Sequence, residues 1–246
     1  MGELPEALKV CLIPVLSDNY VFVIEHGQQA AVVDPAVAEP VIAALEAKGL
    51  ELTAILHTHH HSDHIGGTPG LLKRWPQARV IASAADRLRI PLQTEGVQGG
   101  DHVPLLGEEV QVLDVPGHTR AHIAFVLPES GHLFCGDTLF AGGCGRLFEG
   151  SAQQMHGSLQ ALAALPAETR VWCAHEYTAS NLTWAAEQHP EDQAIAARLA
   201  EVLERRHQGL PTIPSSIGLE RATNLFVRAP NPGALAELRR SKDHWR

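Results

Sequence analysis

The densest group of residues that could do chemistry lies in the segment 58–67, which reads THHHSDHIGG. His59, His61, Asp63 and His64 share one short loop, directly after an apolar stretch that predicts a strand. Imidazoles together with a carboxylate suit zinc, iron or manganese, whereas calcium and magnesium prefer oxygen ligands alone. A solvated surface loop or a tag-like tract is the simpler interpretation. A tag, however, would be a homopolymer at a terminus, so the segment predicts a metal site.

Three distant fragments, VPGHT, GDT and AHEY, strengthen the prediction of a metal site. They contribute His118, Asp137 and His175, and each of these residues comes where an apolar strand is expected to end. Loops that follow the strands at one edge of a sheet are where such folds assemble their sites. Taken singly, each residue could be a turn former or a helix cap. Together with the segment 58–67, these three fragments favour a shared site.

The elements that would position these residues change in character near residue 174. Before that point, short strands alternate with helices and with loops rich in Gly, Pro, Asp and His. The strands are expected at 30–34, 52–56, 80–82, 110–115, 122–127, 132–135 and 171–173, and the helices at 40–49, 71–75 and 154–165. Beyond it, helices are expected at 178–188, 191–208 and 233–245, the last of them begun by Asn231 and Pro232. We therefore expect a catalytic domain of residues 1–174 and a helical domain of residues 175–246.

Composition limits the possible partners. The chain has 246 residues, of which 45% are hydrophobic, and a net charge of −9. The negative charge disfavours binding to nucleic acid or anionic lipid, and there is no apolar run long enough to span a membrane. The first residues lack the pattern of a signal peptide, and the four cysteines are scattered, as in reduced proteins. We expect a cytoplasmic protein with neither nucleic-acid nor membrane partners, and a monomer by default.

The ordered motifs resemble the metallo-β-lactamase superfamily and, more closely, the glyoxalase II (hydroxyacylglutathione hydrolase) family. The closer likeness rests on DNY at 18–20, GCGRLFEG at 143–150, HEY at 175–177 and RRSKD at 239–243. It covers essentially the whole chain. The resemblance implies an α+β fold, a four-layered αβ/βα metallo-β-lactamase sandwich with a C-terminal helical domain.

The resemblance also implies two divalent metal ions per chain, zinc first, with iron or manganese as alternatives. The implied ligands are His59, His61 and His118 for one metal and Asp63, His64 and His175 for the other, with Asp137 bridging the two. A metal-bound hydroxide, with Asp63 and Asp137 holding the metals, would attack a carbonyl carbon. His57 and His60 have no place in this assignment, and we expect structural roles for them.

A third implication concerns the substrate, S-(2-hydroxyacyl)glutathione. The residues that would grip its glutathione part are Arg146, Phe148, Tyr177, Arg239 and Lys242. Family members can carry Tyr where this chain has Phe148, so a hydroxyl contact would be lost there. The expected reaction hydrolyses S-D-lactoylglutathione to glutathione and D-lactate, in methylglyoxal detoxification. Thiolate is a good leaving group, which suits a site without an obvious proton donor.

Other interpretations make different demands on the sequence. Cys144 could be proposed as a nucleophile, although a thiol in a Gly-rich turn more often fills space. Ser158 lacks the strand-to-helix context of a nucleophilic serine. A persulfide dioxygenase of the same superfamily is the main alternative, but it would lack a comparable C-terminal helical domain. An exported β-lactamase would need a signal peptide, and a tRNA-processing nuclease would need a basic surface. A non-enzymatic metal-binding module would not need cationic substrate-binding loops.

Overall fold

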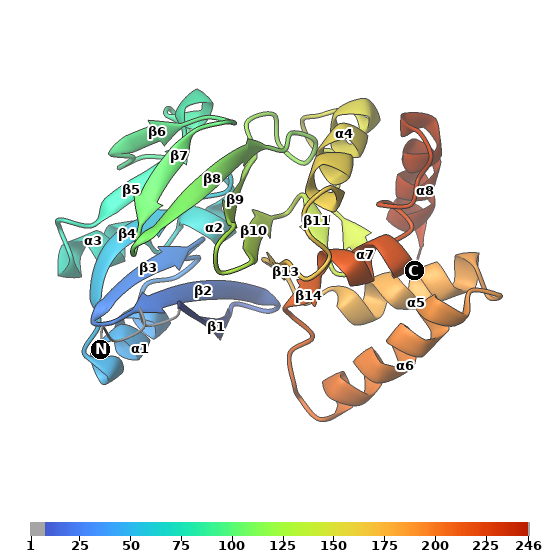
Figure 1. Ribbon diagram of the computed structural model, residues 1–246, viewed down its shortest axis with the longest axis horizontal. Coiled ribbons are helices and arrows are strands. Elements are labelled where there is room, and N and C mark those ends of the chain that lie inside the picture. Colours follow the sequence, from blue (N-terminus) through green and yellow to red (C-terminus); the bar gives the residue numbers. More distant parts are fainter. Residues whose placement is uncertain (1–7, 246) are drawn as a thin grey trace, which may run out of the picture. The chain divides into compact units, whose positions relative to one another are not determined.

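The computed structural model describes residues 8–245 and divides into two compact units (Figure 1). Unit 1 runs to Leu113 and includes Phe125–Gly131, and unit 2 comprises Asp114–Ala124 together with the chain from His132 onward. The first seven residues, which belong to the stretch examined for a signal peptide, lie outside the described residues. Within residues 8–245, no helix combines the length and the apolar character that crossing a bilayer requires.

Unit 1 is built around a six-stranded mixed sheet in the order β1-β2-β3-β4-β5-β6. Its strands are β1 (Lys9–Val15), β2 (Asn19–His26), β3 (Gln29–Val33), β4 (Glu51–Leu56), β5 (Arg79–Ser83) and β6 (Glu95–Val97). The first three pair antiparallel and the last four pair parallel. The other elements are α1 (Glu39–Lys48), α2 (Ser62–Ile65), α3 (Thr68–Arg74), a 3₁₀ turn at Ala84–Asp86, and the antiparallel pair β7 (His102–Leu105) and β8 (Glu108–Asp114).

The parallel strands of unit 1 bring the residues that follow them to one edge of the sheet. Val33 at the end of β3 is the register partner of Leu56 at the end of β4. The next residues along the chain, Asp34 and His57, therefore lie side by side, and the backbone N–H of Asp34 donates to the carbonyl of Leu56 at 3.0 Å. Helix α1, which connects these strands, ends as predicted at Gly49, whose φ of 65° is left-handed.

Unit 2 combines the strands β10 (His132–Gly136), β13 (Arg170–Cys173) and β14 (Ser215–Ser216) with the hairpin of β11 (Leu139–Phe140) and β12 (Gly143–Cys144). Strands β10 and β13 run parallel, with Gly136 opposite Cys173. Asp137 and His175 follow these two strand ends. The helices of unit 2 are α4 (Ala152–Ala163), α5 (Thr178–Gln188), α6 (Gln193–His207), α7 (Ile217–Thr223) and α8 (Pro232–His244), and β9 (Ile123–Leu127) is divided between the units.

Several elements agree closely with the sequence-based predictions. Helix α5 has the predicted bounds, and Asn231 caps α8 by accepting the backbone N–H of Ala234 at 2.9 Å. Strands β1 and β2 and the short helix α7 were not predicted. Helix α7 contains Gly218 and spans only seven residues, so its formation depends on tertiary contacts more than on local preference.

Candidate metal centre and adjoining cavity

The candidate ligands of unit 1 begin in the loop that follows β4. His59 is buried, and its Nδ1 lies 3.1 Å from Oγ1 of Thr58 while its Nε2 lies 3.0 Å from Nδ1 of His61. The rings of His59 and His64 have centroids 4.0 Å apart. Asp34, His59 and His64 each offer a ligand atom, and these atoms lie within 4.8 Å of one another. Nitrogen and carboxylate donors at this spacing form a set that suits a divalent transition metal.

Asp34 anchors this loop from the neighbouring strand end. Its carboxylate accepts the backbone N–H of Thr58 at 2.8 Å and the hydroxyl of Thr58 at 2.6 Å. Oδ2 of Asp34 also lies 3.0 Å from Nδ1 of His64. Burial raises the pKa of Asp34, but the imidazoles of His64 and His57 outweigh this effect and hold the pKa well below its usual range. The ionised carboxylate therefore orients the loop that carries the candidate ligands.

Asp63 is the remaining candidate ligand of unit 1. The amide of Asn19 donates to Oδ2 of Asp63 at 3.0 Å and to the backbone carbonyl of Asp63 at 3.3 Å. The same Oδ2 lies 3.7 Å from Nε2 of His64. Asn19 belongs to the DNY motif that contributed to the family resemblance, and its amide holds the Asp63 carboxylate in place.

The two histidines that were left out of the metal assignment contact residues that are not assigned as ligands. Nε2 of His57 lies 2.8 Å from the hydroxyl of Thr68. Nδ1 of His60 lies 3.4 Å from the buried carboxylate of Asp86. These contacts match the structural roles expected for both histidines.

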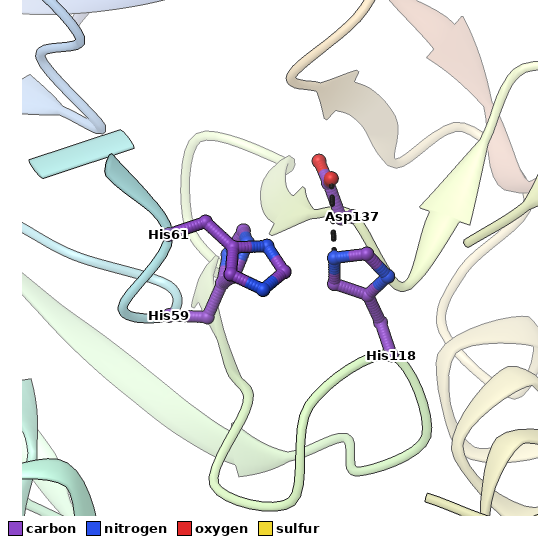
Figure 2. A group of neighbouring side chains, drawn as sticks. All are labelled: His59, His61, His118 and Asp137. Carbon is purple, nitrogen blue, oxygen red and sulfur yellow. Dashed lines mark hydrogen bonds and ion pairs between the residues drawn. The ribbon is translucent and has the colours of Figure 1, made fainter. Parts of the chain in front are cut away.

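The candidate ligands of unit 2 are grouped around Asp137 (Figure 2). Oδ2 of Asp137 lies 3.4 Å from Nε2 of His118, the pair joined by the dashed line, and Oδ1 lies 3.4 Å from Nε2 of His175. Figure 2 also draws His59 and His61 of unit 1, the other histidines assigned with His118 to one metal. Because each oxygen of one carboxylate faces a different imidazole, Asp137 has the geometry of a bridging ligand.

Backbone groups and one further histidine orient the unit 2 ligands. Nδ1 of His118 donates to the backbone carbonyl of Arg146 at 2.9 Å, which leaves Nε2 unprotonated and able to bind a metal. The backbone N–H of Asp137 donates to Nε2 of His122 at 3.2 Å. His122 thus holds the backbone of a candidate ligand.

A cavity of about 490 Å³ lies next to His118 and Asp137 within unit 2. The candidate glutathione-binding residues all line it: Arg146, Phe148, Tyr177, Arg239 and Lys242. Sequence reasoning did not identify Ser180 and Trp245, which line the same cavity. Neither belongs to one of the motifs, so no signal in the sequence marked them.

The aromatic residues of the cavity pack against candidate metal ligands. The ring of Tyr177 stacks on that of His175, with centroids 4.8 Å apart and an interplanar angle of 8°. The ring of Phe148 is 5.2 Å from that of His118, although 63% of the Phe148 surface is exposed. Phe148 therefore offers an apolar surface beside the candidate metal site, where Tyr would offer a hydroxyl.

Lys242 and Arg239 differ in how many of their N–H donors are hydrogen-bonded within the protein. Nζ of Lys242 donates to the backbone carbonyl of Ser180 at 2.9 Å and lies 4.1 Å from the ring centre of Trp245. Burial, and then the charge of Arg239, lower the pKa of Lys242 to about 8. Arg239 is itself buried, and Nη1 donates to the carbonyl of Cys144 at 2.8 Å while Nε donates to Asp243 at 3.0 Å. Lys242 is thus the more available cation.

The proposed alternatives for a side-chain nucleophile receive no support from their surroundings. Burial raises the pKa of the Cys144 thiol to about 11, although Arg239 acts in the opposite direction. A protonated thiol is a poor nucleophile at neutral pH. Ser158 is buried on α4, and its hydroxyl donates to the backbone carbonyl of Pro116 at 2.7 Å. Neither residue is paired with a general base among the contacts that the described residues make.

Comparisons with known proteins show the family of the chain. The family model described as Metallo-beta-lactamase superfamily matches residues 15–175, and the model described as Hydroxyacylglutathione hydrolase C-terminus matches residues 176–245. A hydroxyacylglutathione hydrolase of Synechococcus sp. (strain CC9605) is 59% identical over 240 residues, covering 95% of this chain and 96% of that protein. One of Prochlorococcus marinus (strain MIT 9303) is 57% identical over 240 residues, covering 95% of this chain and 92% of that protein.

Solved structures show the same fold. The crystal structure of ETHE1 from Myxococcus xanthus matches with a TM-score of 0.71 at 26% identity, covering 98% of this chain and 93% of that one. The crystal structure of TTHA1623 in a di-iron-bound form matches with a TM-score of 0.65 at 26% identity, over 88% of this chain and 100% of that one. The predicted α+β metallo-β-lactamase fold is confirmed, and the chain belongs to the hydroxyacylglutathione hydrolase family of the metallo-β-lactamase superfamily.

Proposed function

We propose that this chain hydrolyses S-(2-hydroxyacyl)glutathione, typified by S-D-lactoylglutathione, to glutathione and a 2-hydroxy acid. The observation that carries the proposal is the cavity that joins the candidate ligands His118 and Asp137 to the cation of Lys242. A thioester carbonyl at one end and a peptide carboxylate at the other fit that arrangement. The C-terminal family match favours this activity over that of a persulfide dioxygenase.

The donor set fits divalent metal ions, which family membership and the His and Asp clusters both support. We assign His59, His61 and His118 to one metal, Asp63, His64 and His175 to the other, and Asp137 to both. Two cations about 3.5–4 Å apart need a shared anion, and the carboxylate of Asp137 faces an imidazole with each of its oxygens. The di-iron form of one structural relative agrees with a count of two. Zinc is the first choice, with iron or manganese as alternatives.

When bound, two such metals would lower the pKa of a water molecule toward about 7 and so supply a nucleophile. The residues of the chain have the remaining tasks. Arg146, Tyr177 and Lys242 bind and orient the tripeptide. Phe148 excludes water from the space beside His118, where the acyl group would lie. The glutathione thiolate leaves without a proton donor.

We further propose that the catalytic domain ends at residue 174 and the helical substrate-binding domain begins at residue 175. The proposed metal ligands lie before or at this boundary, and most of the proposed substrate contacts lie after it. The two family models meet between residues 175 and 176, which supports this division. We infer a monomer that works in the cytoplasm on glutathione adducts derived from methylglyoxal.

The test is a coupled assay on S-D-lactoylglutathione, with metal analysis of the same preparation. We expect release of free thiol in proportion to bound metal, and loss of both after chelation. A preparation that holds two metals per chain but releases no thiol from this substrate would refute the proposed activity. Oxygen consumption with glutathione persulfide would support the dioxygenase alternative.

A further inference from the structure

Helix α8 contacts the segment Cys144–Arg146 at two points. Nη1 of Arg239 donates to the backbone carbonyl of Cys144 at 2.8 Å. One turn further along α8, Oδ1 of Asp243 accepts a hydrogen bond from Nε of Arg239 at 3.0 Å. The same oxygen lies 3.7 Å from Nε of Arg146. A single carboxylate oxygen therefore joins the two arginines. The guanidinium of Arg239 also lies over the ring of Phe226, 5.1 Å from its centre, so its position is tightly defined.

The same short segment orients the candidate ligand His118. The backbone carbonyl of Arg146 accepts the Nδ1 proton of His118 at 2.9 Å. A Cβ on Gly145 would lie 2.0 Å from the carbonyl oxygen of Asp137 and 2.9 Å from Nδ1 of His118. The backbone of the segment is therefore packed directly against both candidate ligands, and a small displacement of it must move at least one of them.

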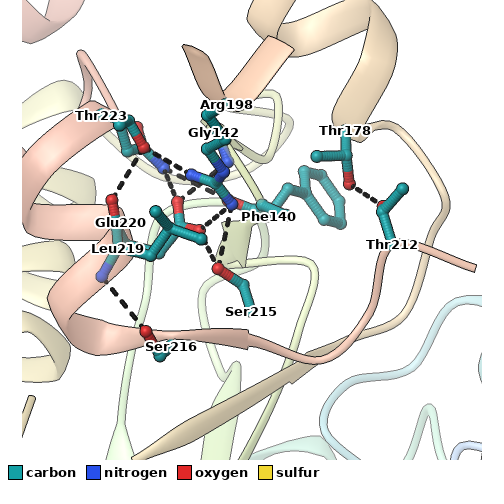
Figure 3. A network of polar contacts seen from close by, with 12 residues as sticks. Phe140, Gly142, Thr178, Arg198, Thr212, Ser215, Ser216, Leu219, Glu220 and Thr223 are labelled. Carbon is teal, nitrogen blue, oxygen red and sulfur yellow. Dashed lines mark hydrogen bonds and ion pairs between the residues drawn. The ribbon is translucent and has the colours of Figure 1, made fainter. Parts of the chain in front are cut away.

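The preceding residues of the loop are held by a different helix. The backbone N–H of Gly142 donates to Glu220 of α7 at 2.8 Å, and Arg198 donates to the same carboxylate group at 2.6 Å (Figure 3). The amide of Asn224 donates to the carbonyl of Gly143 at 2.9 Å. Helix α7 thus secures the hairpin turn before Cys144, whereas α8 secures the residues that contact His118.

We infer that Arg239 and Asp243 are positioning residues for the metal ligand His118, acting through the backbone of Cys144–Arg146. This inference rests on the proposed role of His118 as a ligand. It separates the tasks of two neighbouring cations on α8. Lys242 binds the substrate, whereas Arg239 keeps the imidazole of His118 aimed at the metal. Loss of an outer contact to a ligand typically costs about 10–100-fold in metal affinity. For Arg239, which acts through a backbone segment, we expect a loss of about tenfold.

The experiment measures zinc affinity of the full-length protein by competition with a chromophoric chelator, in the absence of any thioester. The variants are Arg239→Lys, which keeps the charge but loses the forked geometry, and Asp243→Asn, which loses the charge that joins the arginines. Arg240→Ala is the matched control, because it removes a neighbouring charge on the same helix without touching the segment. We expect weaker zinc binding in both variants and unchanged binding in the control.

Steady-state kinetics supply the second measurement. Arg239→Lys and Asp243→Asn should lower kcat at saturating substrate, whereas Lys242→Met should mainly raise KM. The unfolding temperature of each metal-free variant, compared with that of the metal-free wild type, separates loss of folding from loss of metal affinity.

Zinc affinities within twofold of the wild-type value for both Arg239→Lys and Asp243→Asn would overturn the inference. The variant His118→Ala then shows which idea has failed, the role given to α8 or the assignment of His118 as a metal ligand. If His118→Ala also keeps the wild-type zinc affinity, the ligand assignment itself is wrong. If only His118→Ala loses zinc, the ligand assignment stands and the role given to α8 is refuted.

Discussion

Oδ2 of Asp34 lies 3.0 Å from Nδ1 of His64, and both side chains are almost completely buried. Because the pKa of Asp34 lies well below its usual range, its carboxylate is ionised and can only accept. Nδ1 of His64 must therefore carry the proton, which makes Nε2 the nitrogen available to a metal. Carboxylate–imidazole pairs of this kind fix the tautomer of a ligand and raise its basicity.

Replacing the carboxylate should weaken metal binding. Asp34→Asn removes the charge and can present an amide N–H to His64, so we expect metal affinity to fall by about 10–100-fold. Chelator competition measures this loss. Asp86→Asn is the control, since Asp86 is a similarly buried carboxylate that contacts His60, which is not a proposed ligand. Equal losses of metal affinity in the two variants would show a general effect of burial and not an effect on His64.

The bridging role proposed for Asp137 predicts that the two proposed metals are lost together. Asp137→Asn keeps the shape of the side chain but removes the shared negative charge. We expect the metal content to fall below two ions per chain, and kcat/KM to fall by more than about 100-fold, beyond the range for outer-shell partners. Elemental analysis of the purified variant measures the first quantity. Two ions bound at unchanged affinity would exclude Asp137 as the bridge.

His60 should tolerate replacement far better than the histidines on either side of it. His60→Ala removes contacts to Asp86 and Arg89, neither of which is a proposed ligand. We expect near-normal metal content, with much smaller losses of activity than in His59→Ala or His61→Ala. Parallel metal analysis of the three variants tests the assignment. A loss of metal from His60→Ala as severe as from the other two would show that the loop binds metal differently.

The lowered pKa of Lys242 predicts a pH dependence of substrate binding. Lys242 is cationic below about pH 8 and becomes neutral as the pH rises through that value. Its attraction for a substrate carboxylate is therefore present at lower pH and lost above about pH 8. We expect kcat/KM for S-D-lactoylglutathione to decline above this pH, mainly through KM, because kcat/KM reports groups of the free enzyme.

Lys242→Arg provides the control for this pH dependence, because a guanidinium stays charged throughout the range. The decline near pH 8 should disappear in that variant. It should also be absent for a small thioester that lacks the tripeptide. A decline that persists unchanged in Lys242→Arg would assign it to another group.

The close packing around Gly145 predicts that Gly145→Ala and Gly157→Ala differ in metal affinity and stability. In Gly145→Ala, the new methyl group would clash with the carbonyl of Asp137, so the loop must shift. We expect reduced metal affinity together with reduced stability. Gly157→Ala lies in α4, where a Cβ meets nothing within 4 Å, and should stabilise the protein by about 0.5–1 kcal/mol without affecting metal. Thermal unfolding and chelator competition on both variants measure the difference. Normal metal affinity in Gly145→Ala would contradict the close packing described here.

The candidate ligands and many of the elements that carry them could be predicted from the sequence. Clustered histidines and strand-terminal His and Asp residues are local signals, because a strand, a turn or a helix cap depends on nearby residues. Asn231 and Gly49 acted as helix boundaries for the same reason. Asp34 carried the same strand-terminal signal as Asp137, yet its sequence context did not indicate that its partner would be His64.

The tertiary structure was needed to show which side chains are hydrogen-bonded within the protein and which remain available to a ligand. Arg239 and Lys242 looked equivalent in sequence, three residues apart on one basic helix. In the folded chain, the donors of Arg239 are taken by Cys144 and Asp243, whereas Lys242 lies half-buried in the cavity with a lowered pKa. The partners Cys144 of Arg239 and Ser180 of Lys242 lie 95 and 62 positions away in the chain. Hydrogen-bond partners and desolvation at that separation are set by the packing of the chain, which local patterns do not encode.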